Sequence, residues 1–257
     1  NILHKEISGL HQAAYLLGFF AFLSQLLALV RDRLLAYFFG ASHSLDLYYA
    51  AFRIPDFIFV SIASVVSISV LIPFLIEKLD SDVEEGKKFI NNVFSTFFLF
   101  ITFVSGIAFL LVPWLLRYFF PILADSPSGG ELISMTRILL LSPIFLGFSN
   151  FFASITQVYK RFVIYAVSPL LYNAGIILGI VVFYPLFGLK GLTYGVALGA
   201  FLHCLIQVPF IWQKGLFPKF VFPIHFSSIR KVFLLSLPRT LTASSNEIAE
   251  FFLVSLA

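Results

Sequence analysis

Residues 26–73 decide how this chain folds, and they read LLALVRDRLLAYFFGASHSLDLYYAAFRIPDFIFVSIASVVSISVLIP. Two long apolar segments are joined there by a short polar turn, residues 40–44. Charged residues lie within or beside both segments, among them Arg31, Asp32, Arg33, Asp46 and Arg53. A charge at membrane depth is costly and is tolerated mainly where it faces a bundle interior or a wet cavity. These residues therefore predict a functional pathway.

The composition excludes a soluble globular domain. The 257 residues are 60% hydrophobic and only 12% charged, and the mean hydropathy is +0.97. A soluble domain is about 25% charged, so this chain has too few polar residues to cover one, and lipid must be its solvent. The basic residues lie singly or in pairs, which does not predict nucleic-acid binding. The lone cysteine, Cys204, excludes an internal disulfide.

Seven segments are long and apolar enough to cross a membrane, which takes about 20 residues in a helix. We therefore predict an all-α fold, a polytopic bundle of about seven transmembrane helices. The longest polar connection is 77–88. Because the chain begins with Asn1 and its last apolar run has no polar flank, we expect it to be part of a longer protein. The segments are Leu10–Phe39, Leu47–Ile76, Phe89–Phe119, Leu132–Val158, Phe162–Phe187, Leu192–Trp212 and Val232–Ala257.

The basic residues of the connections predict a cytoplasmic N-terminus, because cytoplasmic loops carry an excess of Lys and Arg. With that orientation, ten basic residues fall in inside connections and two fall outside. The inside set is Lys5, Lys78, Lys87, Lys88, Lys160, Arg161, Lys214, Lys219, Arg230 and Lys231, and the outside set is Arg117 and Lys190.

Three of the charges at membrane depth form a candidate substrate site. Asp46 and Arg53 are seven residues apart, so they share one helix face, roughly 10 Å apart along the axis. Arg31 and Arg53 lie toward the outer ends of consecutive helices, so both can face one outward cavity. A guanidinium binds phosphate bidentately and stays charged. We therefore predict that Arg31, Arg53 and Asp46 bind an anionic substrate such as a lipid phosphate.

Structural roles compete with this interpretation. Long basic side chains also reach the membrane interface or form structural pairs. We expect Arg33 and Arg239 to reach the interface in this way. A structural ion pair is expected for Asp32, whereas Arg137 fits either kind of role.

A second polar patch lies in the seventh segment. Glu247 and Glu250 are three residues apart on one helix face, and Ser244, Ser245 and Asn246 precede them. Oxygen ligands of this kind suit a hard cation. The pair is therefore a candidate site for ion coupling by Na⁺ or H⁺, and a polar face turned to the bundle interior is the alternative.

No motif for metal binding or catalysis stands out. His203 and Cys204 lie in an apolar run with no further ligand nearby, so we expect an interior histidine with a hydrogen-bond partner and no metal site. The sequence contains no Gly-rich phosphate loop, HExxH or GxSxG. We predict a protein that is not an enzyme and has no cofactor apart from the candidate coupling cation. Separately, the glycines Gly188, Gly191, Gly195 and Gly199 predict close helix packing.

The opening motif resembles a known family. The residues Leu29-Val30-Arg31-Asp32, Phe39-Gly40-Ala41, Asp46 and Ala51–Phe57 are similar to the start of the MurJ/MviN-type lipid II flippases. These belong to the multidrug/oligosaccharidyl-lipid/polysaccharide exporter superfamily. Weaker similarities follow at Lys160–Phe162, Ser168-Pro169 with Asn173, Gly188–Gly199, Gln207 with Pro209, and Leu237–Arg239. The resemblance covers nearly the whole chain, but only the opening motif is specific.

The resemblance implies two six-helix lobes that rock around a cationic cavity to give alternating access. Residues 1–231 would form the first lobe, and 232–257 the first helix of an incomplete second lobe. The implied activity is transport of an undecaprenyl-pyrophosphate-linked peptidoglycan precursor, lipid II, across the bacterial inner membrane during cell-wall biogenesis. Arg31 and Asp46 match charged cavity residues of the family, and Arg53 matches the basic residue of its F-[RK]-[IL]-P run. The expected partners are this anionic lipid, membrane lipids and cell-wall synthesis proteins, without nucleic acid.

The chain departs from the family pattern where members often carry further charges. It has Gln25, Phe59-Val60 and Ser64-Val65 at those positions, so we expect a less basic cavity, and the lipid headgroup stays open. Two alternatives remain: an exporter of another lipid-linked oligosaccharide in the superfamily, and a non-transporting membrane scaffold. A second six-helix lobe downstream would favour transport, whereas a soluble domain would favour a scaffold.

Overall fold

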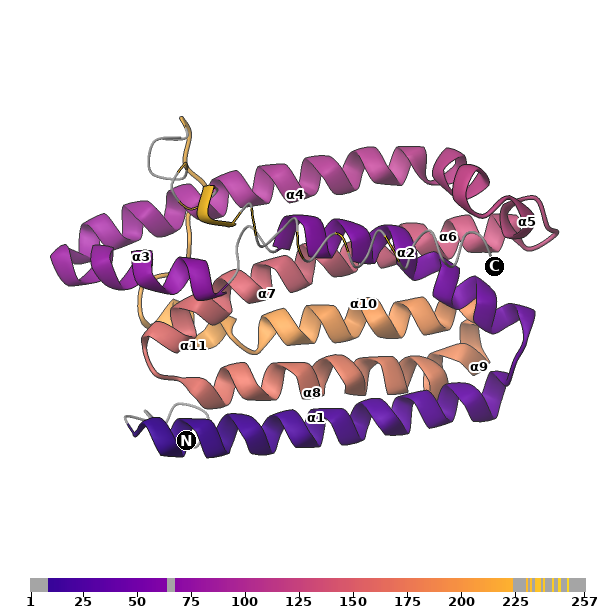
Figure 1. Ribbon diagram of the computed structural model, residues 1–257, viewed down its shortest axis with the longest axis horizontal. Coiled ribbons are helices and arrows are strands. Elements are labelled where there is room, and N and C mark those ends of the chain that lie inside the picture. Colours follow the sequence, from indigo (N-terminus) through magenta and orange to yellow (C-terminus); the bar gives the residue numbers. More distant parts are fainter. Residues whose placement is uncertain are drawn as a thin grey trace.

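The computed structural model describes residues 9–63 and 68–223, together with nine separate residues between 230 and 249. Helices run along one axis (Figure 1), and the described ranges contain no strand, so the all-α prediction is confirmed. The helices are α1 Leu10–Phe39, α2 His43–Ala63, α3 Ile68–Ser81, α4 Val83–Phe119, α5 Pro121–Ala124, α6 Gly129–Leu139, α7 Leu141–Val158, α8 Phe162–Leu178, α9 Tyr184–Phe187, α10 Leu189–Leu205 and α11 Val208–Gln213, with a π-helical turn at Gly179–Phe183.

Five helical stretches in the described residues are long and apolar enough to cross a membrane. They match the first, third, fourth, fifth and sixth predicted segments. The second predicted segment is occupied by two helices, α2 and α3, and most of the seventh lies outside the described residues. The stretches are His11–Phe39, Val83–Phe119, Gly129–Val158, Phe162–Phe187 and Leu189–Gln213.

The charged run 77–88 is helical, whereas the sequence predicted a polar connection. Helix α3 continues to Ser81 and α4 begins at Val83, with only Asp82 between them. The Asp82 side chain caps α4 by accepting a hydrogen bond from the backbone N–H of Glu84 at 3.2 Å. Carboxylates near a helix N-terminus are stabilised by the helix dipole, so Glu84 and Glu85 in the first turn favour this early start.

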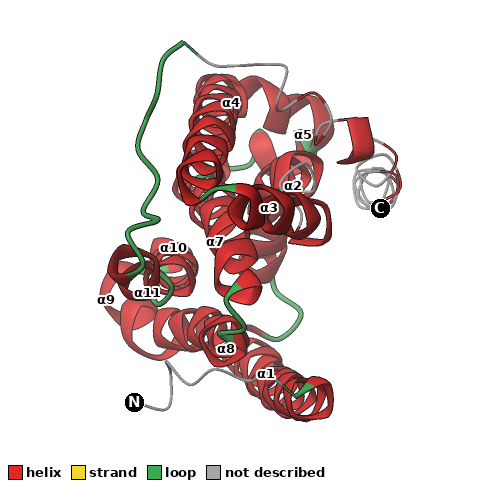
Figure 2. Cartoon of the chain, turned by 90° about the vertical axis from the view of Figure 1, so that its left-hand side faces the viewer, coloured by secondary structure: helices red, strands yellow, loops and turns green. Residues whose placement is uncertain are grey.

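The helices pack in two neighbouring groups that meet at α7 and α10. In the end-on view of Figure 2, α2, α3 and α4 lie above α7, and α1, α8 and α10 lie below it. Helix α10 packs against both α7 and α8, whereas α1 contacts the bundle mainly through α8. Stacked phenylalanines fill the contact between α4 and α7: the ring centroids of Phe98 and Phe148 are 5.6 Å apart.

The predicted close packing of glycines is confirmed where α8 crosses α10. We call Gly175, Gly179, Gly191, Gly195 and Gly199 the glycine seam. A Cβ atom on Gly195 would lie 2.3 Å from the Cα of Gly179, and one on Gly175 would lie 2.3 Å from the Cα of Gly199. Only glycine permits this backbone approach. Gly188 has a different role, because it ends α9 with a φ of 63°.

Candidate functional site

Arg31 lies on the part of α1 that contacts α8. Its Nε and Nη2 atoms each approach Asp32 Oδ1 at 2.8 Å, and its Nη1 donates to Asn173 Oδ1 at 3.1 Å. The side chain nevertheless remains 26% exposed. The guanidinium is therefore held in place from two sides and still keeps an accessible edge.

Asn173 organises this contact from within α8. Its amide oxygen accepts from Arg31, and its Nδ2 donates to Ser24 Oγ at 3.2 Å and to the Pro169 carbonyl at 3.2 Å. The residue is only 6% exposed. A buried amide needs such partners because an unsatisfied polar group is costly. We call Arg31, Ser24 and Asn173 the polar clasp, since they join α1 to α8.

Polar residues of α2 and α8 lie close to the polar clasp. Arg31 and Asp56 both lie within electrostatic range of the phenols of Tyr48 and Tyr172. Tyr48 is buried in α2, and Tyr172 lies one residue before Asn173 in α8. Neither tyrosine stands out in the sequence, and Asp56 is visible there only as part of the motif Ala51–Phe57. Together with the clasp they gather polar groups from α1, α2 and α8.

The three predicted substrate residues differ in how far they are exposed and in which contacts they make. Arg53 is half-buried in α2, two residues before Pro55, whereas Asp46 is exposed in the first turn of that helix. The described residues show no hydrogen bond or ion pair between Asp46 and Arg31. A carboxylate in a first turn is stabilised by the helix dipole, which gives Asp46 a structural explanation. A cavity shared by Arg31, Arg53 and Asp46 stays a prediction.

The neighbours of Arg31 have distinct environments. The structural ion pair predicted for Asp32 is confirmed, with Arg31 as its partner. Arg33 is exposed and lines a groove on α1 with Leu29 and Tyr37. Its predicted reach to the membrane interface stays a prediction.

Arg137 has a structural role on the other side of the bundle. Its Nε donates to the Phe109 carbonyl in α4 at 3.2 Å, and its guanidinium carbon lies 4.7 Å from the centroid of the Phe109 ring. Pro113 follows four residues after Phe109, and proline has no N–H to complete the helical hydrogen bond to that carbonyl. Arg137 of α6 therefore supplies the donor that Pro113 lacks.

His203 has the hydrogen-bond partner that the sequence predicted. Its Nδ1 lies 2.6 Å from Ser149 Oγ, and Gln207 Nε2 donates to the Ser149 carbonyl at 3.1 Å. Within the ranges that the structure describes, no group of three His, Cys, Asp or Glu side chains is arranged to hold a metal ion. Glu247 and Glu250 lie outside the described residues, so their role in ion coupling stays a prediction.

One feature of the sequence indicates that Asn173 makes a contact inside the bundle. Asn173 stands in the apolar run FVIYAVSPLLYNAGIIL, where an amide must find a partner inside the bundle. Its partners, Arg31 and Ser24, are about 140 or more residues away in the sequence. No local pattern in one sequence identifies a contact at that separation.

Comparison with known proteins finds relatives along most of the chain. The family model of the lipid II flippase MurJ matches residues 35–257. The chain is 28% identical over 231 residues to a probable lipid II flippase MurJ of Borreliella burgdorferi, which covers 86% of this chain and 42% of that protein. It is 29% identical over 237 residues to a probable lipid II flippase MurJ of Buchnera aphidicola, which covers 88% of this chain and 45% of that protein.

A solved structure has the same fold. It is the lipid II flippase MurJ in an inward closed conformation, and it matches with a TM-score of 0.76 at 26% identity. The match covers 94% of this chain and 50% of that chain. The chain thus spans about half the length of the relatives that it matches.

Proposed function

The chain belongs to the lipid II flippase MurJ family, and from this premise we propose that it is the N-terminal part of a flippase for an undecaprenyl-pyrophosphate-linked peptidoglycan precursor. The chain is a multi-pass helical membrane protein. Transport across the bacterial inner membrane proceeds by alternating access between this lobe and a second lobe. The protein moves its substrate and does not convert it chemically.

The polar clasp is the observation that carries the proposal. Arg31 lies in the apolar helix α1, and only 6% of the residues in an apolar 18-residue window of that helix are buried inside the protein. A guanidinium carries five N–H donors on three nitrogen atoms, and the contacts with Asp32 and Asn173 engage one donor on each nitrogen. The remaining donors can bond phosphate oxygens, and charge-assisted bonds of this kind are the strong ones. Arg31 therefore suits the pyrophosphate of the substrate.

The distribution of basic residues supports a cytoplasmic N-terminus. Helices α3 and α11 lie with the N-terminus at the left of Figure 1, whereas α9 lies at the opposite end. Lys78 is in the last turn of α3 and Lys214 follows α11, whereas Lys190 lies in the first turn of α10, directly after α9. Cytoplasmic surfaces are enriched in basic residues. In this orientation Arg31 lies in the periplasmic half of α1, where the substrate is released.

Arg53 and Asp46 have secondary roles in the proposal. Arg53, which follows Asp46 on the same face of α2, supplies a second guanidinium to the anionic headgroup. Asp46, exposed at the start of α2, orients the substrate near the outer mouth. Glu247 and Glu250 couple transport to Na⁺ or H⁺, and cell-wall synthesis proteins are the proposed protein partners.

Translocation by the reconstituted full-length protein tests the proposal. We expect Arg31→Ala to abolish movement of the lipid-linked precursor while insertion into the membrane is unchanged. Arg33→Ala is the matched control, because Arg33 carries the same charge two residues away and is exposed. Normal translocation by Arg31→Ala, or equal losses in both variants, would contradict the role of Arg31.

A further inference from the structure

A cavity of about 560 Å³ lies at the end of the bundle that carries most basic residues. It is bounded by the end of α3, the start of α4 and the segment 214–223 that follows α11, which we call the strap. In Figure 2 the strap crosses from α11 to α4. The lining includes Lys78, Glu85, Lys88, Phe89, Asn91 and Phe222.

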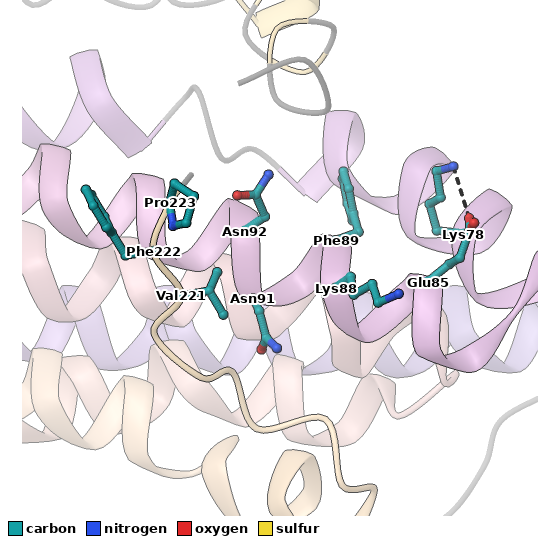
Figure 3. Close-up of a pocket in the computed structure, with 9 residues that line it drawn as sticks. All are labelled: Lys78, Glu85, Lys88, Phe89, Asn91, Asn92, Val221, Phe222 and Pro223. Atoms are coloured by element: carbon teal, nitrogen blue, oxygen red, sulfur yellow. Dashed lines mark hydrogen bonds and ion pairs between the residues drawn. The ribbon is translucent and has the colours of Figure 1, made fainter. Parts of the chain in front are cut away.

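The strap forms one wall of this cavity, and two hydrogen bonds from its backbone attach it to α4. The Lys219 N–H donates to Asn91 Oδ1 at 2.7 Å, and the Val221 N–H donates to Ser95 Oγ at 2.9 Å. The Ser95 hydroxyl itself donates to the Asn91 carbonyl at 2.7 Å. Figure 3 shows Val221 beside Asn91, with Phe222 and Pro223 farther along the strap. Because Asn91 uses its oxygen for the strap, its NH₂ group remains available to a ligand.

The charges of the cavity favour an anion. Lys78 pairs with Glu85 at 3.4 Å, as Figure 3 shows, so these two charges offset each other. Lys88 is exposed and forms no ion pair with any residue that the structure describes. Lys87 differs, because it pairs with Glu84 at 2.7 Å and does not line the cavity. Lys88 therefore gives the cavity a net positive charge.

The apolar part of the lining favours an amphiphile over a free ion. Both Phe89 and Phe222 line the cavity, and Phe89 is buried whereas Phe222 is 82% exposed. The strap also exposes Phe220, which is 53% exposed. Exposed aromatic side chains beside lysines are typical of the membrane–water interface. The cavity thus combines an anion-binding charge with a surface for acyl chains at the depth of lipid headgroups.

We propose that this cavity binds the phosphate headgroup of an anionic phospholipid in the cytoplasmic leaflet, with Lys88 against the phosphate and Phe222 against the acyl chains. Basic pockets between membrane helices on the cytoplasmic side recognise anionic lipids in this way. The bound lipid joins the strap to the start of α4. The proposal rests on the cytoplasmic orientation proposed above, but it does not require Arg31 or transport.

Native mass spectrometry of the full-length protein tests this site. The probes are phosphatidylglycerol, phosphatidylcholine and inorganic phosphate, each added at low ionic strength because salt screens exposed charges. We expect one phosphatidylglycerol to bind more tightly than phosphatidylcholine. Lys88→Gln weakens that binding about fivefold, the contribution of one lysine near a lipid surface. Lys87→Gln is the matched control and leaves the affinity unchanged, because Lys87 does not line the cavity.

The apolar half of the site has its own variant. Phe222→Ala weakens phosphatidylglycerol binding, and the variant folds because the side chain is largely exposed. Equal affinities for the wild type and Lys88→Gln would overturn the proposal. Equal effects of Lys87→Gln and Lys88→Gln would show that the lipid binds through the general surface charge and not in the cavity. That result would also overturn the proposal. Displacement of the lipid by an equal concentration of inorganic phosphate would show a free-anion site instead.

Discussion

The two faces of α8 make opposite kinds of contact. Toward α10 the glycine seam brings backbone against backbone, so that no Cβ fits between Gly195 and Gly179. Toward α1 the polar clasp joins the helices through Asn173, Ser24 and Arg31. The backbones packed at the glycine seam cannot replace this contact with another one. The guanidinium of Arg31, in contrast, can exchange the amide oxygen of Asn173 for a phosphate oxygen. We therefore expect α8 and α10 to move as one body and α1 to change its contacts during transport.

The largest expected effect comes from filling the glycine seam. Gly195→Val places side-chain atoms where the Gly179 Cα lies only 2.3 Å from the first added carbon. Neither backbone can yield without separating the helices, so we expect a loss of at least about 3 kcal/mol in unfolding free energy. Thermal unfolding of the purified protein in detergent measures it.

Gly18→Val is the control for that experiment. A Cβ atom on Gly18 of α1 would meet nothing within 4 Å, so the stability should change by less than about 0.5 kcal/mol. Similar losses in both variants would show that the loss does not come from the close contact between α8 and α10.

Breaking the polar clasp has the next largest effect. Asn173→Ala removes the acceptor for Arg31 Nη1 and the donor to Ser24. Hydrogen bonds to charged groups contribute about 1.5–3 kcal/mol, and we expect a loss at the lower end because the Arg31 contact with Asp32 remains. Chemical unfolding of the variant gives the value. Ser24→Ala should cost less, since it leaves the bond between Arg31 and Asn173 in place, and the reverse order would contradict this account.

Arg137 provides a third kind of contact between helices, because its guanidinium donates to a backbone carbonyl and is not expected to bind a ligand. Arg137→Leu leaves the Phe109 carbonyl without its donor and should cost about 1 kcal/mol. Pro113→Ala restores a backbone N–H to that carbonyl. We therefore expect Arg137→Leu to cost less in the Pro113→Ala background. A double-mutant cycle of unfolding free energies measures the coupling, and strictly additive effects would refute it.

The smallest effect is expected at Asp32, which lies beside the polar clasp and pairs with Arg31. Asp32→Asn removes the ion pair with Arg31, but the Asp32 side chain is 56% exposed. Exposed ion pairs contribute about 0–1 kcal/mol, so we expect a loss of stability smaller than that of Asn173→Ala. A larger loss in Asp32→Asn would mean that Asp32, and not α8, holds Arg31 in place.

The sequence predicted the helices better than it predicted their partners. Composition and run length alone located five stretches that the structure confirms as long, apolar helices. The glycine spacing predicted a close contact correctly, because Gly191, Gly195 and Gly199 mark one face of a single helix. These features are local, so one sequence contains them.

Three features were predicted wrongly or incompletely, because they depend on contacts between distant residues or on a charged composition that resembles a loop. The run 77–88 reads as a polar loop because it is charged, yet its acidic residues stabilise a helix start after Asp82. Arg137 fitted two roles until its contact with Phe109 appeared, since Pro113 and Arg137 are on different helices. The partner of Arg31 in α8 lies 142 residues away. Tertiary packing decided all three.

Binding of the lipid-linked pyrophosphate substrate to the full-length protein tests most directly whether Arg31 is the group that receives the anionic headgroup. The dissociation constant should be measured for the wild type, Arg31→Ala and Arg33→Ala at one ionic strength. We expect Arg31→Ala to weaken binding at least about tenfold, as the loss of a charged hydrogen bond implies, and Arg33→Ala to bind like the wild type. Equal affinities of the wild type and Arg31→Ala would contradict the account.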